Sequence, residues 1–188
     1  MTPLAYAGGV TSAADARQLV KLGADRICLE HLFSVAPDRC REIRDSVGVQ
    51  AVIRALTLEV DETGAVQRYD YLTRKTDALD VGKLSEDEQG MFSELMVIDR
   101  KGDGGLEAYD ERVLIPFAAT PFQIIAFGGI TSKQQVQRLL ARPELSAVGV
   151  GNSLSYRELA NRRLLNSADT HETRKTSHGA QSRGARQW

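Results

Sequence analysis

The chain has 188 residues, of which 42% are hydrophobic and 26% are charged, and its formal net charge is -1. This length and composition are typical of one globular domain with a hydrophobic core. The near-zero net charge gives no electrostatic reason to expect a nucleic-acid partner. No apolar run approaches the roughly 18 residues that a membrane span needs, and no secretory leader pattern is present. We therefore expect a cytoplasmic protein that binds neither a membrane nor nucleic acid.

Two cysteines are present, Cys28 in an apolar segment and Cys40 in the segment APDRCREI. Their spacing is not that of metal ligands, and one disulfide would do little to stabilise a fold of this size. We expect two reduced structural thiols, no metal site and no cofactor.

Six apolar segments with strand character follow one another along the chain, and segments with helical periodicity separate them. Such an alternation is typical of βαβ units and of a parallel sheet. In chain order the segments are PLAYA, RICLE, VQAVIRAL, ELMVI, FQIIAF and SAVGVG. The sequence therefore predicts an α/β fold with six parallel strands.

Two helices between these strands have clear starting signals. The first is predicted over residues 12–22 and the second over residues 132–141. Each begins with a serine that can cap the helix, followed three positions later by a polar residue, and each has apolar residues at helical spacing.

A hairpin is predicted after the third strand. The segment LTLEVDETGAVQRYDYL contains two strand-like halves that turn at residues 62–64. The acidic run SEDEQ at residues 85–89 is expected to be the solvated start of a helix, where negative charges are favourable.

A Gly-Gly pair occurs twice in similar surroundings, as Gly8–Gly9 in AGGVTS and as Gly128–Gly129 in FGGITS, 120 residues apart. Four βα units of about 30 residues fit in that interval. In an eightfold barrel built from two similar halves, equivalent turns lie four units apart, so the repeat favours a (β/α)8 TIM-type barrel. Such a barrel typically needs about 200 to 250 residues.

The first strand is predicted almost at Met1, so we expect six of the eight units, with the first two βα units lacking. Truncation, a misplaced start, or pairing with another copy would each account for this.

The Gly-Gly turns also have a chemical interpretation. A glycine pair at the carboxyl end of a strand lets backbone amides approach an oxyanion, and the N-terminus of the following helix adds partial positive charge. The alternative is a tight βα loop without a ligand. Two copies at this spacing favour phosphate, bound at Gly128, Gly129 and, from the next strand end, at Gly151 and Asn152; the earlier copy contributes Gly9.

Residues 3–160 resemble the cyclase subunit of imidazole glycerol phosphate synthase and its paralogues. The resemblance rests on GGVTSAADARQLVKLGADRI, VGVQAV, ELMVIDRKGDGGLEAYD and IIAFGGITS. It implies a phosphate-binding barrel, a lyase of histidine biosynthesis that takes ammonia from a glutaminase subunit and cyclises a substrate with two phosphates. Paralogues in surface-polysaccharide gene clusters aminate sugars instead, and AVGVGNSLSYREL is more similar to those.

The resemblance carries over only part of the family's catalytic machinery. The family uses two aspartates, one on the first barrel strand and one on the fifth. The first strand has no match in this chain, and the position of the second aspartate falls on Thr57. A hydroxyl has no useful pKa near neutrality and cannot replace a carboxylate in proton transfer.

The loop after the sixth barrel strand matches better. Asp103 and Gly104 correspond to the family's Asp-Gly, so Asp103 is a catalytic candidate and Gly104 a phosphate-binding candidate, but Gly105 stands where a threonine contacts phosphate. Glu30 and His31 replace an asparagine and a small hydroxyl residue at the family's first phosphate site. A carboxylate at Glu30 would repel phosphate.

Arg26 and Glu94 each stand at the start of a strand and match charged residues of the family's ammonia gate. Their alternative role is a salt bridge that closes the bottom of the barrel.

The chain is expected to divide into an incomplete barrel over residues 1–160 and a polar, basic, disordered tail over residues 161–188. Two functional classes stay open. One is a glutaminase-dependent enzyme subunit, and the other is a catalytically degenerate paralogue or remnant that still binds phosphate.

Overall fold

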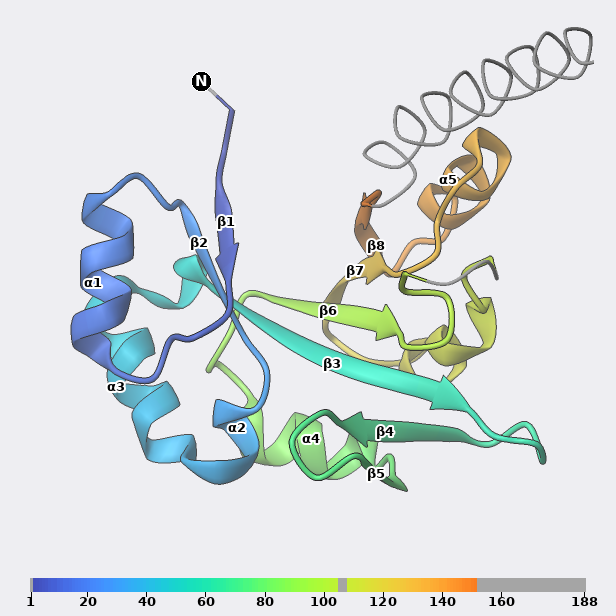
Figure 1. Cartoon of the computed structure of the whole chain (residues 1–188), viewed down its shortest axis with the longest axis horizontal. Coiled ribbons are helices and arrows are strands. Elements are labelled where there is room, and N and C mark those ends of the chain that lie inside the picture. The colour runs from blue at the N-terminus through green and yellow to red at the C-terminus, as the bar shows by residue number, and fades with distance from the viewer. Residues whose placement is uncertain (1, 105–107, 152–188) are drawn as a thin grey trace, which may run out of the picture. The chain divides into compact units, whose positions relative to one another are not determined.

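The computed structural model describes residues 2–104 and 108–151 (Figure 1). The predicted tail, Gly105 and Asn152 lie outside the described residues. In chain order the elements are β1 (Ala5–Ala7), α1 (Ala13–Lys21), β2 (Arg26–Leu29), α2 (Leu32–Val35), α3 (Pro37–Val47), η1 (Val49–Ala51), β3 (Val52–Val60), β4 (Val66–Asp70), β5 (Lys75–Ala78), α4 (Val81–Glu88), β6 (Glu94–Asp99), η2 (Glu111–Phe117), β7 (Gln123–Phe127), α5 (Lys133–Leu140) and β8 (Leu145–Gly149). No described helix is both long and apolar enough to cross a membrane.

All six predicted strands are present and form a parallel sheet in the order β1-β2-β3-β6-β7-β8. The longest pairing joins β3 and β6, from Ile53 opposite Glu94 to Leu58 opposite Asp99. Among the described residues β1 and β8 each have one neighbouring strand, so the sheet is open. The architecture is a parallel α/β half-barrel, in agreement with the predicted six units.

One face of the central strands is buried against helices, as expected for parallel strands with crossover helices, and the other face is only partly buried. Alternate strand residues such as Ile27, Val52 and Leu95 pack against the helices in the main core. The residues between them face the inside of the half-barrel, where Cys28, Ile53 and Ala55 form a smaller cluster with Met96, Ile98 and Ile125. Because the strands are parallel, the last residues of each strand lie at one edge of the sheet, the carboxyl edge.

The two predicted helices are confirmed together with their caps. The Ser12 hydroxyl accepts a hydrogen bond from the Asp15 backbone N–H at 3.2 Å, and the Ser132 hydroxyl accepts one from Gln135 at 3.1 Å. Each bond satisfies an otherwise free donor in the first turn of its helix. The shared serine thus gives both copies of the repeat the same strand–turn–helix geometry.

The predicted hairpin is also present. β4 pairs antiparallel with β3 and β5 with β4, and the Gly64 N–H donates to the Asp61 carbonyl in the turn. Figure 1 shows the β4–β5 hairpin beside the carboxyl half of β3. The hairpin carries residues 66–78 back toward the carboxyl edge of the sheet.

The prediction for the acidic run at residues 85–89 is wrong. Helix α4 begins at Val81, because the Asp80 side chain accepts a hydrogen bond from the Lys83 N–H at 2.9 Å and caps the helix there. The run therefore lies at the end of the helix. Nor is it wholly solvated, since the Glu88 carboxylate contacts buried Arg54 at 2.9 Å.

Candidate functional site

The carboxyl ends of the parallel strands meet at one edge of the sheet, where binding sites of such folds lie. Glu30 follows β2, Thr57 lies in β3, Asp99 ends β6 and the Gly128–Gly129 turn follows β7. Gly151, two residues beyond β8, is exposed at the same edge. The topology thus brings most of the predicted site residues to one side of the molecule.

The two Gly-Gly turns have the same backbone conformation. Gly8 and Gly9 have φ angles of 108° and 67°, and Gly128 and Gly129 have φ angles of 104° and 74°. These values lie in the left-handed region that glycine adopts without strain. The sequence echo is therefore a structural repeat.

The surroundings of the two turns differ. A Cβ at Gly129 would lie 2.7 Å from the Gly102 Cα, and one at Gly128 would lie 2.6 Å from the Asp99 carbonyl oxygen. A Cβ at Gly9 would meet no atom within 4 Å. The second turn therefore needs glycine for close backbone packing as well as for its φ angles.

The backbone N–H groups two residues after each glycine pair, those of Thr11 and Thr131, also differ in their hydrogen-bond partners. In the first copy the Asp15 carboxylate accepts hydrogen bonds from the Thr11 N–H and hydroxyl, both at 3.1 Å, and these bonds lower the pKa of Asp15. In the second copy Gln135 occupies the position of Asp15 and donates instead to the Tyr109 carbonyl at 3.1 Å. No described residue accepts a hydrogen bond from the Thr131 N–H. An internal carboxylate thus occupies the first turn, and the second turn is open to an external acceptor.

Asp99 is a residue of this edge that the sequence analysis did not single out. Its carboxylate is buried and accepts hydrogen bonds from the Lys101 N–H at 3.1 Å and the Asp110 N–H at 2.9 Å. Burial raises its pKa, although the backbone bonds oppose the rise. Asp99 thus fixes both ends of the loop after β6; its place at the end of an apolar strand was the available signal.

Asp103 and Gly104, the predicted loop residues, lie in the turn that Asp99 begins. The Asp103 N–H donates to the Asp99 carbonyl at 2.9 Å, and Gly104 has a φ angle of 68°. A Cβ at Gly128 would lie 3.3 Å from the Asp103 Cβ. Asp103 is exposed and stands beside the second glycine turn.

Thr57, which the resemblance predicts to stand at the position of the family's second aspartate, is fully buried. Among the described residues its hydroxyl oxygen makes no hydrogen bond of normal geometry, although the hydroxyl is near enough to the Tyr71 phenol to lower the pKa of Tyr71. Its backbone N–H donates to the Glu30 carboxylate at 3.1 Å. Glu30 therefore places a carboxylate oxygen beside the backbone of Thr57.

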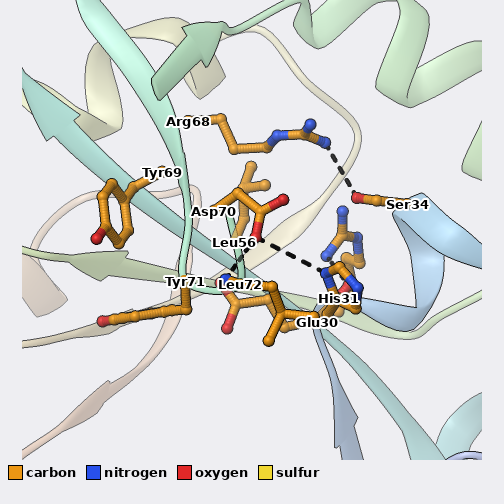
Figure 2. Close-up of a pocket in the computed structure, with 10 residues that line it drawn as sticks. Glu30, His31, Ser34, Leu56, Arg68, Tyr69, Asp70, Tyr71 and Leu72 are labelled. Carbon is orange, nitrogen blue, oxygen red and sulfur yellow. Dashed lines mark hydrogen bonds and ion pairs between the residues drawn. The ribbon is translucent and has the colours of Figure 1, made fainter. Parts of the chain in front are cut away.

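A cavity of about 100 Å³ lies between the end of β2, helix α2 and the hairpin (Figure 2). His31 Nδ1 lies 3.9 Å from Asp70 Oδ1 across it. A backbone hydrogen bond from Leu72 lowers the pKa of Asp70. The cavity is lined by Glu30, His31, Ser34, Arg54, Leu56, Arg68, Tyr69, Asp70, Tyr71 and Leu72.

Tyr71 connects this cavity with the rest of the carboxyl edge. Partial burial raises the pKa of its phenol, and the negative charges of Asp103 and Glu30 raise it further. Tyr71 lines the cavity together with Glu30, so the end of β4 lies close to the end of β2.

Arg26 and Glu94 lie at the opposite, amino-terminal edge and form an ion pair. Arg26 also donates to the Ser93 hydroxyl at 3.2 Å, and the Ser146 hydroxyl donates to Glu94 at 2.9 Å. The structure thus brings the two predicted gate residues together in one polar cluster.

Comparison with known proteins shows which family this chain resembles. Residues 1–160 match the family described as histidine biosynthesis protein. Over 142 residues the chain is 30% identical to the imidazole glycerol phosphate synthase subunit HisF of an Exiguobacterium species, covering 74% of this chain and 55% of the relative. The HisF subunit of a Synechococcus species is 27% identical over 68% of this chain and 50% of the relative. That of Acidobacterium capsulatum is 27% identical over 77% of this chain and 58% of the relative.

The chain thus spans about half the length of the curated relatives that it matches. The family match covers every described strand, including both glycine turns and the hairpin. The chain belongs to the histidine biosynthesis protein family, and its six parallel strands form a partial barrel of that family.

Proposed function

We propose that this protein binds the phosphate of a small phosphorylated metabolite at the Gly128–Gly129 turn, as a barrel subunit related to imidazole glycerol phosphate synthase. One observation carries the proposal. The Thr131 N–H at the start of α5 has no described partner, whereas a carboxylate already occupies the equivalent Thr11 N–H. An open N–H beside a glycine turn and a helix N-terminus is the usual setting for a bound phosphate. Gly151 and Asn152 complete the proposed site.

Phosphate is expected to bind to the second turn alone. In an amide NMR titration with inorganic phosphate, the resonances of Gly129 and Thr131 should shift, and those of Gly9 and Thr11 should stay in place. Gln135→Asp recreates the carboxylate of the first turn and should weaken binding at least about tenfold through like-charge repulsion and occupation of the N–H. The converse variant, Asp15→Gln, frees Thr11 and should create a response there.

Equal shifts at both turns of the wild type, or at Thr11 alone, would contradict this assignment. Because Gln135 also bonds to the Tyr109 carbonyl, the folding of Gln135→Asp must be checked from its unaffected resonances. The Asp15→Gln variant alters a half-buried residue and tests the same principle independently.

The imidazole-forming reaction itself is expected to be absent. With ammonium salt and the histidine-pathway substrate, the purified chain should show no turnover above background, because Thr57 lacks the family's carboxylate and one acid–base group contributes about 10²- to 10⁴-fold. Thr57→Asp alone should not restore turnover, since the resemblance places the family's other aspartate on the first barrel strand, which has no match in this chain. Wild-type turnover at rates typical of the family would refute this prediction.

Two roles follow for the protein within this proposal. Buried Thr57 favours a phosphate-binding paralogue with altered or lost chemistry. The Arg26–Glu94 pair favours a subunit that receives ammonia, because it lies at the edge where the resemblance places a glutaminase. Co-purification with a co-expressed glutaminase subunit, lost on Glu94→Ala, would select the second role.

A further inference from the structure

The β4–β5 hairpin is paired with the sheet over only part of its length. β4 pairs with β3 from Val66 to Arg68, whereas β4 and β5 stay paired with each other from Gln67 to Asp70. Beyond Arg68 the described residues show no further backbone pairing between the hairpin and β3, and every residue of β5 is exposed. Residues 69–77 thus form a hairpin arm whose displacement breaks no pairing of the parallel strands.

Partly exposed side-chain contacts hold the hairpin arm in place. The Arg100 guanidinium carbon lies 3.9 Å from the centre of the Tyr69 ring, and His31 Nδ1 lies 3.9 Å from Asp70 Oδ1. Tyr71 packs edge-on against Tyr69, with ring centres 5.1 Å apart, and is itself 51% exposed. Contacts of this kind near the surface are individually weak, and segments with little apolar burial open most readily.

The end of the hairpin arm lies against Thr57. The Thr57 side chain alternates with neighbours in β3 and shares the inner face of the half-barrel with Ile53 and Ala55. The Tyr71 phenol is near enough to the Thr57 hydroxyl for that hydroxyl to lower the pKa of Tyr71. Tyr71 also lines the cavity of Figure 2 together with Glu30, whose carboxylate accepts the Thr57 N–H at 3.1 Å. Tyr71 therefore covers the inner mouth of the half-barrel at Thr57.

The Thr57 hydroxyl gives the hairpin arm two favourable positions. This hydroxyl is fully buried, and it makes no hydrogen bond of normal geometry to a described residue. A buried hydroxyl without a partner is unfavourable, and nearly all such groups in folded proteins are paired. A small approach of the Tyr71 phenol would pair the two hydroxyls, and withdrawal of the arm would expose Thr57 to water. The observed arrangement thus lies between a closed arm and an open one.

We infer that the hairpin arm is a lid over the inner mouth of the half-barrel, and that a hydrogen bond between Tyr71 and Thr57 latches it shut. Opening exposes Thr57 and Glu30, so the lid controls the access of ligands to the ends of β2 and β3. The inference goes beyond the proposed function, because it does not concern the Gly128–Gly129 turn and its test needs no phosphate.

Amide hydrogen exchange in the full chain measures the opening, through the protection factor at residue 57 compared with those of β6 and β7. The Thr57 N–H, bonded to Glu30, is expected to exchange when the arm opens. Tyr71→Phe removes the latch and keeps the ring, so it should lower protection at residue 57 about fivefold, as expected for the loss of one hydrogen bond, and leave β6 and β7 unchanged. Thr57→Val keeps the side-chain shape and should have the same effect, and the double variant should add nothing further.

Tyr6→Phe is the matched control. It removes the same hydroxyl from an exposed tyrosine of β1, outside the hairpin, and protection at residue 57 should be unchanged. Unchanged protection in Tyr71→Phe would overturn the inference, and so would equal losses at residue 57 and in β6 and β7. Higher protection in Thr57→Val would also overturn it, because that is the result for a buried hydroxyl that never finds a partner. If Thr57→Val fails to fold, Tyr71→Phe decides alone.

Discussion

Gly129→Ala is expected to lower the free energy of unfolding by about 3 kcal/mol, whereas Gly9→Ala is expected to lower it by about 1 kcal/mol. Both residues have positive φ angles, 74° and 67°, so each alanine pays a left-handed backbone cost of about 1 kcal/mol. At Gly129 the new Cβ also meets the Gly102 backbone at 2.7 Å, and backbone cannot yield as a side chain can. Such overpacking typically adds about 1–3 kcal/mol.

Urea unfolding of the two variants and the wild type measures the difference directly. The paired design removes the common backbone term, since the same substitution is made in the same turn. Equal losses of stability at the two positions would show that the close approach to Gly102 carries no energetic weight.

Glu88→Ala is expected to destabilise the protein by about 3 kcal/mol, because it leaves the guanidinium of Arg54 buried without its counter-ion. The Arg54 side chain is 2% exposed, and its guanidinium carbon also lies 4.5 Å from the centre of the Phe33 ring. Glu86→Ala is the matched control in the same helix. Glu86 is exposed, so its loss should cost less than about 0.5 kcal/mol.

A double variant separates the buried charge from simple packing. Arg54→Met combined with Glu88→Leu removes both charges and keeps apolar volume, and it should recover most of the stability lost in Glu88→Ala. If Glu88→Ala unfolds at the same urea concentration as Glu86→Ala, the ion pair between Glu88 and Arg54 does not stabilise the fold.

Most of the fold could be predicted because its signals are local. Apolar runs separated by helical periodicity predicted all six parallel strands, and Ser12 and Ser132 predicted two helix starts. The hairpin after β3 followed from its turn residues. The start of α4 was missed because two acidic segments compete as helix starts, and the hydrogen bond from Lys83 to Asp80 decides between them.

The candidate site was only partly predictable, because its electrostatics depend on residues far apart in the chain. The sequence by itself determined the repeat, because the Gly-Gly pair recurs in similar surroundings and glycine adopts positive φ angles without strain. The φ angles of Gly8–Gly9 and Gly128–Gly129 agree accordingly. The bonds between Thr11 and Asp15 are local, because the two residues are four positions apart at the start of α1. Tertiary structure alone decided that Gln135 reaches the Tyr109 carbonyl, that Glu30 reaches Thr57 and that Arg54 reaches Glu88. These contacts join side chains that only the parallel sheet brings together, so local sequence patterns contain no trace of them.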